Sequence, residues 1–232
     1  MEKKNITVFS YSIIIYALLC TNTRGAWIGA TVAIIAYIFM HRLFLINYKQ
    51  DIRRITAILL ITFVIIFMFN SLNNNKFAYR FKSIFMDATK ILKDEGAEKA
   101  GSNRFFIWKN VLILIKDRPL TGYGIENLGE PFVARFEQEM IDLFGTTYHV
   151  DKAHNEYLHI AVTTGIPSLI VYCLFITQIL CQGLQKARKN CFYSPYIASV
   201  LGYLCQAFFN ISVVSVVYIF WVFLGFICSY EN

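Results

Sequence analysis

Six long runs of apolar residues, each nearly free of charge, limit what this chain can fold into. Inside a bilayer every backbone N–H and C=O group must find its partner within the protein, so apolar runs of near-membrane length favour helices. Several runs are shorter than the ~20 residues that cross a bilayer, but flanking Thr, Ser, Asn and Gly extend them. We therefore expect an all-α integral membrane protein with about six transmembrane helices, at 6–20, 26–40, 55–69, 166–181, 196–209 and 213–228.

The composition agrees with a membrane protein. Of the 232 residues, 56% are hydrophobic and the mean hydropathy is +0.49, whereas a soluble domain holds about 45–50% apolar residues. All six cysteines lie in or beside the apolar runs, and segment 70–153 has none. A disulfide framework would place cysteines in the oxidising compartment. We therefore expect unpaired cysteines that are buried as small apolar side chains.

The distribution of basic residues predicts the orientation. The run ends on one side carry Lys3, Lys4, Arg42, Lys49, Arg53, Arg54, Lys186, Arg188 and Lys189, and the short segments on the other side carry only Arg24. By the positive-inside rule, both termini then lie in the cytoplasm of a multi-pass plasma-membrane protein. This asymmetry accounts for most of the net charge of +7. It argues against a nucleic-acid partner, because such proteins concentrate basic charge on one groove or face.

The chain is expected to have three parts. They are three transmembrane helices in 1–69, an extracytoplasmic loop or lid in 70–153, and three transmembrane helices in 154–232. Within the loop, apolar residues at helical spacing predict amphipathic helices at 76–92 and 126–145. Segment 103–116 is too short to span and too apolar for water. We expect it to be an interfacial helix that lies on the bilayer or is docked over the helix bundle.

Two arginines are candidates for anion binding. Arg24 lies in Thr-Asn-Thr-Arg-Gly at the outer end of the first helical hairpin, and its guanidinium presents a planar fork that matches phosphate oxygens. A snorkelling interfacial arginine is the alternative. Arg104 begins a predicted helix, where a cation opposes the helix dipole. It is then either solvated or paired with an anion that binds there.

His154 and Asn155 form a polar pair in front of the fourth apolar run. A histidine near the outer membrane surface titrates close to neutral pH and can act as a base or as a hydrogen-bond donor. The alternative is a polar helix cap, in which Asn155 satisfies free backbone donors. His159 follows His154 by five residues, which does not fit the i, i+4 zinc pair of a metalloprotease.

Three segments, in this order, resemble the superfamily of O-antigen ligases and O-antigen polymerases, which are bacterial membrane glycosyltransferases. The first is 21–29, where Thr23-Arg24-Gly25 stands in place of the more usual Ser-Arg-Gly. The others carry Arg104, Trp108, Pro119, Gly122 and Gly124, and then His154, Asn155, Leu158, Gly165 and Pro167. The resemblance covers the C-terminal half of the family. Because relatives have further spans before the first segment, the resemblance implies a fragment, a degraded copy or a subunit that needs a partner.

The resemblance implies an enzyme that moves a glycan from undecaprenyl pyrophosphate to an acceptor hydroxyl outside the plasma membrane. It implies no cofactor, no nucleotide sugar and no catalytic metal. By motif position, Arg24 and Arg104 would bind the pyrophosphate, and His154 would orient or deprotonate the acceptor hydroxyl or assist at the phosphate. Asn155 and Trp108 would complete the substrate site. Fixed cations at the leaving group can supply much of such catalysis.

Two alternatives remain open. One is transfer of the glycan onto protein. The other is a non-catalytic membrane component or a transporter in a glycan-export complex. A transporter is expected to show repeats and broken helices with charges near the bilayer midplane. Here the polar candidates gather at the outer ends of the runs, which favours chemistry at the membrane surface.

Overall fold

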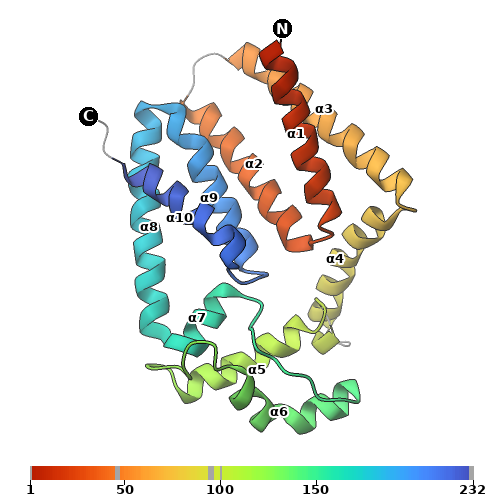
Figure 1. Cartoon of the computed structure of the whole chain (residues 1–232), viewed down its shortest axis with the longest axis vertical. Coiled ribbons are helices and arrows are strands. Elements are labelled where there is room, and N and C mark those ends of the chain that lie inside the picture. The colour runs from red at the N-terminus through yellow and green to blue at the C-terminus, as the bar shows by residue number, and fades with distance from the viewer. Residues whose placement is uncertain (1, 45–47, 94–96, 100, 230–232) are drawn as a thin grey trace.

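The computed structural model describes residues 2–44, 48–93, 97–99 and 101–229 (Figure 1). All regular elements in this part of the chain are helical, and their bounds are α1 (Glu2–Cys20), α2 (Arg24–Phe44), α3 (Tyr48–Leu72), α4 (Lys76–Lys93), η1 (Ala97–Lys99), α5 (Arg104–Asp117), α6 (Gly129–Phe144), α7 (Glu156–Thr164), α8 (Ile166–Lys189), η2 (Cys191–Tyr193), α9 (Ser194–Ala207) and α10 (Val214–Cys228). The all-α prediction is confirmed.

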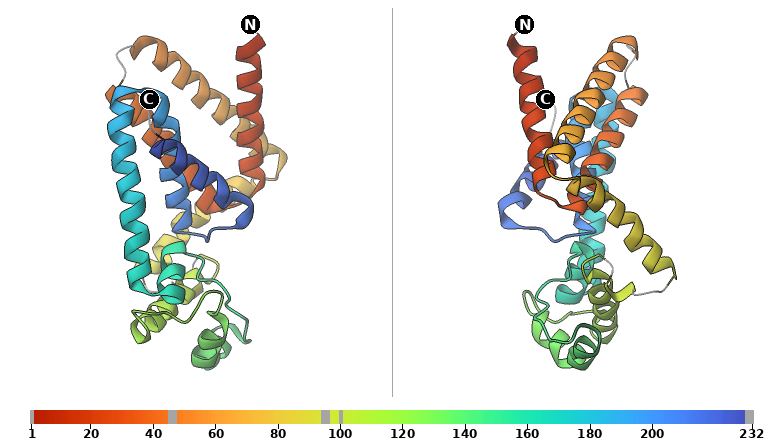
Figure 2. Two further views of the ribbon diagram at one scale, coloured as in Figure 1. Left: turned by 60° about the vertical axis from the view of Figure 1, so that its left-hand side comes forward. Right: turned by 90° about the vertical axis from the view of Figure 1, so that its right-hand side faces the viewer.

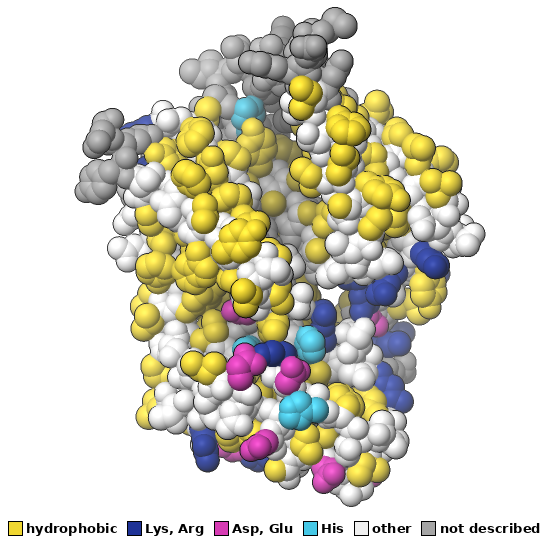
Figure 3. All heavy atoms as spheres, viewed as in Figure 1, with side chains coloured by type: hydrophobic (Ala, Val, Ile, Leu, Met, Phe, Trp, Pro, Cys, Tyr) yellow, Lys and Arg dark blue, Asp and Glu magenta, His cyan; other side chains and the backbone are white. Residues whose placement is uncertain are grey.

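The helices form two layers along the long axis of the molecule. The upper layer in Figure 1 is a bundle of α1, α2, α3, α8, α9 and α10, and the lower layer contains α5, α6 and α7. Helix α4 leads from the bundle to the lower layer, and the views in Figure 2 agree. On the face drawn in Figure 3, hydrophobic side chains cover the upper layer, and most charged side chains gather on the lower one. We call the lower layer the cap.

Helices α2 and α9 form the closest contact of the bundle. A Cβ atom on Gly29 would lie 2.6 Å from the carbonyl oxygen of Gly202, and one on Gly202 would lie 2.7 Å from the Cβ of Ala33. Such small residues let the backbones of two membrane helices come into contact. In lipid the hydrophobic effect does not drive helices together, so van der Waals packing between them stabilises the pair. Around this contact Met40, Ile197 and neighbouring side chains form a buried core.

The predicted number of six membrane spans is not confirmed. Within the described residues, two helical segments are long and apolar enough to cross a membrane, Arg24–His41 and Ile166–Lys189. A third candidate is the pair Thr56–Leu72 and Lys76–Lys93, which is bent by 102° at its break. Ile6–Cys20 and Val214–Cys228 are apolar but shorter. The apolar runs lie in helices as predicted, but the expected extension of the short runs by flanking polar residues does not bring Ile6–Cys20 and Val214–Cys228 to membrane-spanning length.

The cap has its own core, built by α5, α6 and α7. Phe106 and Leu114 of α5 pack with Phe132 and Met140 of α6 and with Val162 of α7, and all five are almost completely buried. Segment 103–116 is therefore docked by its apolar residues against other helices of the protein. Of the two arrangements predicted for it, the docked one is closer to the structure, because the buried apolar side chains of the segment lie in this core, namely Phe106, Ile107, Val111, Leu114 and Ile115.

The cysteines differ from the prediction. Cys20, Cys173, Cys181, Cys191 and Cys228 are free and exposed, and Cys205 is free and half-buried. The expected burial was wrong, although all six are unpaired as predicted. The physical reason is that an apolar helix in a membrane protein carries apolar residues both toward its neighbours and toward lipid. The sequence pattern does not distinguish these two faces.

The start of α1 and the end of α10 lie toward the same end of the molecule, opposite α5 and α6 (Figure 1). This arrangement agrees with termini on one side of a membrane, but it does not identify the compartment. Part of the charge pattern behind the predicted orientation lies outside the described side chains, namely Lys3, Lys4, Arg42, Lys49, Arg53 and Arg54. The orientation stays a prediction.

Candidate functional site

A cavity of about 290 Å³ lies where α2, α4 and α5 meet. Its polar lining residues are Arg24 at the start of α2, Asp87 of α4 and Arg104 at the start of α5, and Trp108 lies one turn further along α5. Apolar side chains, Ile28 among them, form the remaining walls. Three of the five residues that the sequence singled out thus line one cavity, although they come from two distant segments.

Arg24 is held at the cavity by helix α4. A short turn after α1, in which Asn22 adopts a positive φ of 53°, places Arg24 as the first residue of α2. Its Nη1 atom donates to Oδ2 of Asp87 at 2.5 Å and to the hydroxyl of Ser83 at 3.1 Å. The side chains of Arg24 and Asp87 are 19% and 22% exposed. This is an oriented, partly buried guanidinium, in contrast to the snorkelling alternative.

Arg104 is the second cation of the cavity. It follows Asn103, which adopts a left-handed conformation with φ 66° and makes no side-chain cap to the helix. Burial, and then the positive charge of Arg24, lower the pKa of the Arg104 guanidinium. The cavity is lined by two guanidinium groups and one carboxylate, so it carries a surplus of positive charge. Such a surplus favours an anion at this place.

Trp108 connects the cavity to the segment that carries His154. Its indole N–H donates to the backbone carbonyl of Ala153 at 3.0 Å. The ring also packs edge-on against Phe208, with centroids 5.5 Å apart. Through these two contacts, Trp108 of α5 touches both the segment before α7 and the end of α9.

His154 itself does not line the cavity, but it lies close enough to Arg104 to respond to its charge. Burial, and then the charge of Arg104, lower the pKa of the His154 imidazole, whereas Asp151 raises it. The residue adopts a positive φ of 50°, an uncommon conformation for histidine. A lowered pKa keeps the imidazole neutral near pH 7, and a neutral imidazole is the form that accepts a proton.

Asn155 caps a helix. Its side chain accepts a hydrogen bond from the backbone N–H of Leu158 at 3.1 Å, and the residue is 2% exposed. This confirms the capping role that was the alternative for this position. The cap fixes where α7 begins, and therefore where His154 stands directly before it. A direct contact of Asn155 with substrate stays a prediction.

The glycines of the resemblance hold the cap together. The backbone N–H groups of Tyr123 and Gly124 donate to the carbonyls of Val162 and Thr163, both at 2.9 Å. A Cβ on Gly122 would lie 2.5 Å from backbone atoms of Thr163. The turn that ends α5 therefore docks on the backbone at the end of α7.

Gly165 provides the other half of this backbone contact. It has a φ of +91°, and a Cβ there would lie 2.2 Å from the carbonyl oxygen of Leu120. The next N–H, that of Ile166, donates to the carbonyl of Pro119 at 2.8 Å. Pro119, Gly122, Gly124 and Gly165 thus serve the backbone architecture that fixes α7 and α8 beside α5.

The sequence analysis missed the anionic partner of Arg24. Asp87 and Ser83 lie in a predicted amphipathic helix that received no functional role. One signal was present, since Asp87 is the single acidic residue among five basic ones between Lys76 and Lys93. A lone carboxylate in a basic helix suggests a specific partner, but only the fold identifies that partner as Arg24.

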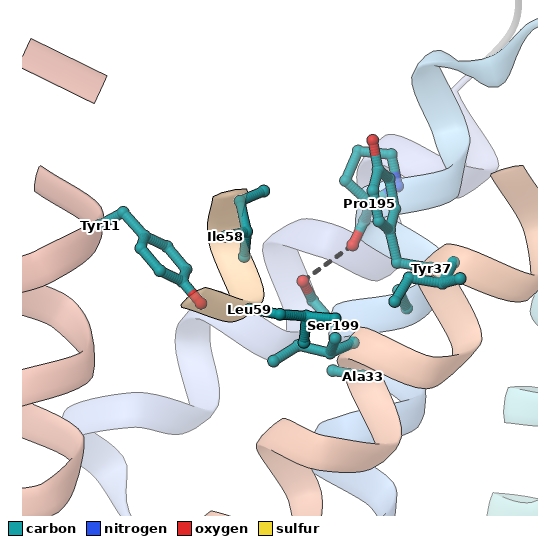
Figure 4. A pocket seen from close by; sticks show the side chains of 10 residues that line it. Tyr11, Ala33, Tyr37, Ile58, Leu59, Pro195 and Ser199 are labelled. Atoms are coloured by element: carbon teal, nitrogen blue, oxygen red, sulfur yellow. Dashed lines mark hydrogen bonds between the residues drawn. The ribbon is translucent and has the colours of Figure 1, made fainter. Parts of the chain in front are cut away.

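A second cavity, also of about 290 Å³, lies within the bundle between α1, α2, α3 and α9 (Figure 4). Its described lining includes the hydroxyls of Tyr11 and Ser199, and both already have partners: Tyr11 pairs with Thr62 at 2.6 Å, and Ser199 donates to the carbonyl of Pro195 at 2.8 Å. Among the described residues that line it, none is acidic, basic or a histidine. This cavity suits an apolar group and offers no cation to an anionic one.

Metal ligands are not gathered at either cavity. Across the described part of the chain there is no group of three or more His, Cys, Asp and Glu residues that could hold a metal ion. The candidate site is therefore defined by its guanidinium groups, one carboxylate and a nearby imidazole.

Comparison with known proteins gives two relatives and one family. A Haemophilus influenzae protein named "Uncharacterized protein" is 27% identical over 178 residues, which are 73% of this chain and 42% of that protein. A Rickettsia conorii protein named "Putative polysaccharide ligase" is 24% identical over 216 residues, 87% of this chain and 47% of that protein. The chain thus spans less than half the length of these curated relatives. No solved structure matches it significantly.

The family match covers residues 9–173, which include Arg24, Arg104, Trp108, His154 and Asn155. The family is described as O-antigen ligase. Together with the apolar helices, this match indicates a membrane protein. On the extent of this match, the chain belongs to the O-antigen ligase family.

Proposed function

We propose that the chain carries the active site of a metal-independent glycosyltransferase at the outer face of the plasma membrane. The enzyme transfers or polymerises a glycan linked to undecaprenyl pyrophosphate, and the acceptor is a hydroxyl group of a second lipid-linked or cell-surface glycan. Arg24 and Arg104 bind the pyrophosphate, and Trp108 contributes a wall of the site. His154 orients or deprotonates the acceptor hydroxyl.

The observation that carries this proposal is the convergence of Arg24 and Arg104 on one cavity. With Asp87 as the carboxylate of this cavity, its groups sum to one surplus positive charge, which favours an anionic ligand. A guanidinium also donates two parallel hydrogen bonds to phosphate oxygens, which fixes their orientation. When the glycan leaves the phosphate, the charge that develops on the pyrophosphate is met by these fixed cations.

The state of His154 supports its role. The pKa of its imidazole is lowered by burial and by Arg104, so the ring is neutral at neutral pH and has a free lone pair. Trp108 holds the carbonyl of Ala153, next to His154. The base and the cation site are thereby connected through one side chain. The acceptor hydroxyl would approach between them.

The membrane arrangement belongs to the same proposal. The cap faces the outside, both termini face the cytoplasm, and the bundle crosses the membrane several times. The undecaprenyl chain stays in the outer leaflet, and its pyrophosphate reaches the cap at the level of α2 and α5. The exposed apolar residues of the bundle support this placement, because contact with lipid is where such side chains are stable.

Glycan transfer can be measured in membranes of cells that produce the chain, with lipid-linked glycan extracted from the same cells as donor. We expect Arg24→Lys to abolish most transfer, because lysine keeps the charge but loses the fork. Arg104→Ala and His154→Ala are expected to do likewise, while all three variants accumulate normally in the membrane.

Lys109→Ala and Arg118→Ala are the matched controls. Both positions are on or beside α5, but Lys109 pairs with Glu139 at 3.5 Å on the surface and Arg118 lies over the ring of Tyr123. We expect transfer within about twofold of the unchanged chain for each, because exposed pairs contribute little. Near-normal transfer by both Arg24→Lys and His154→Ala would refute the proposed site and favour a non-catalytic role.

A further inference from the structure

Helix α4 occupies the candidate site of this chain with a charged group of its own. Asp87 lines the cavity that contains Arg24 and Arg104. Its carboxylate and the hydroxyl of Ser83 both accept a hydrogen bond from Nη1 of Arg24. The carboxylate is thus bound where the proposed function places an anionic phosphate. This contact has no part in the proposed chemistry.

A carboxylate and a pyrophosphate cannot share this cavity at low cost. Like charges within a few ångströms repel each other strongly when both are partly buried. The cavity measures about 290 Å³, and Asp87 and Ile84 of α4 form part of its wall. A ligand that accepts a hydrogen bond from Nη1 of Arg24 must displace Asp87. Otherwise the ligand binds in direct contact with the Asp87 carboxylate.

The remaining attachment of α4 is weak. None of its described residues is buried, and Leu92, Tyr79 and Phe85 are 85%, 73% and 61% exposed. Near its start, the ring of Phe77 packs on Trp27 with centroids 4.7 Å apart. The middle of the helix is tied to α2 by Arg24, through Asp87 and Ser83. If this tie is broken, the helix keeps only its N-terminal attachment and a few apolar contacts.

We propose that Asp87 is an internal counterion that occupies Arg24 until the pyrophosphate of the lipid-linked substrate replaces it, so that α4 is a latch over the site. This inference rests on the proposed function. In the empty site Asp87 orients Arg24 and lowers the cost of two neighbouring cations. When the substrate arrives, its phosphate oxygens take over Arg24. The carboxylate is released to solvent and the middle of α4 is no longer tied to α2.

Binding of radiolabelled undecaprenyl pyrophosphate to the purified chain in lipid nanodiscs tests the exchange. We expect Asp87→Asn to bind about three- to tenfold more tightly, since a partly exposed ion pair no longer competes. Ser83→Ala should give a smaller gain, because it removes one hydrogen bond from Arg24 but leaves the competing carboxylate in place. Asp142→Asn is the charge-matched control: it removes one acid of the cap whose partner is Gln138, and its affinity should stay unchanged.

The double variant Arg24→Ala with Asp87→Asn separates exchange from a general effect of charge. If the gain comes from a freed Arg24, the double variant binds no more tightly than Arg24→Ala alone. In transfer assays, Asp87→Asn should lower KM without lowering kcat. A collapse of kcat would overturn the inference, because the carboxylate would then take part in the reaction. Unchanged or weaker binding by Asp87→Asn would overturn it as well, since Asp87 would then only support Arg24.

Hydrogen exchange gives a second measurement. When undecaprenyl pyrophosphate is added, amides in the middle of α4 should exchange faster while those at the start of α5 exchange more slowly. Unchanged or slower exchange in α4 would contradict the latch. If Arg24→Ala and Arg104→Ala lose binding but Asp87→Asn shows no gain, the counterion role of Asp87 is rejected and the proposed function stands. Normal binding in those two arginine variants rejects the proposed function itself.

Discussion

Trp108 donates its indole N–H to the backbone carbonyl of Ala153, the residue directly before His154. This hydrogen bond joins the helix that begins with Arg104 to the segment that carries the proposed base. His154 has a positive φ of 50°, which is uncommon for a residue with a side chain of this size. Asn155 caps the next helix on the other side. The backbone of His154 is thus held in place on both sides.

Trp108→Phe should therefore reduce activity more than stability. The phenyl ring keeps most of the packing against Phe208 but loses the hydrogen bond, which contributes about 1 kcal/mol. We expect at least a tenfold loss of kcat, since small misplacements of a reacting group are costly, with a small change in Tm. Trp221→Phe, on α10, is the control and should leave both values near normal. Equal kcat for the two variants would show that the bond to Ala153 has no role in positioning.

The backbone contact between the end of α5 and the end of α7 predicts a strong effect on stability. Gly122→Ala and Gly165→Ala each combine a positive φ with a Cβ that would lie within 2.5 Å of backbone atoms. We expect each to destabilise the protein by about 3 kcal/mol or more, measured as a lower Tm in detergent.

Gly145→Ala is the matched control for this contact. Gly145 also has a positive φ, of +76°, but nothing lies within 4 Å of its added Cβ. We expect a cost of only about 1–2 kcal/mol from the left-handed conformation. A Tm as low as that of Gly122→Ala would mean that φ alone, and not the close backbone approach, requires glycine in the cap.

The pH dependence of transfer should report on His154. Burial and Arg104 lower the pKa of its imidazole, so the neutral form persists to more acidic pH. The acid limb of kcat/KM should therefore lie below the usual histidine value of about 6.5. Asp151 raises this pKa, because it favours the charged ring. Asp151→Asn should then move the limb to lower pH. A limb that moves upward would assign the titration to another group.

Transfer should survive chelation. In the proposed mechanism, the guanidinium groups of Arg24 and Arg104 supply the positive charge that a divalent cation supplies in other phosphate sites. Activity measured with and without excess EDTA should agree within the error of the assay. Loss of transfer with EDTA, followed by recovery with one particular divalent ion, would count strongly against an arginine-only site.

Thiol labelling tests the orientation. Lys93 ends α4 and Cys191 follows α8, and these helix ends lie at opposite ends of the molecule (Figure 1). In a chain whose other cysteines are replaced by alanine, Cys191 should react with a membrane-impermeant reagent only after permeabilisation. With Cys191 also replaced, Lys93→Cys should react in intact cells. The reverse pattern would place the cap in the cytoplasm.

The sequence by itself determined the helical class, the position of the apolar helices and the residues of the candidate site. Apolar runs must be helical in a bilayer, and Arg24, Arg104 and His154 were conspicuous as charged or polar groups at the ends of such runs. The family match includes all three positions. These features are local or depend on composition, so they can be read along the chain.

Only the tertiary structure decided which of these groups meet. It brought Arg24 and Arg104 to one cavity, placed His154 beside it through Trp108, and revealed Asp87 as the partner of Arg24. The exposure of the cysteines was not predictable from hydropathy. Whether an apolar side chain faces a neighbouring helix or lipid depends on packing between segments distant in sequence. The same packing makes a solitary acid in a basic helix the counterion of an arginine sixty-three residues earlier.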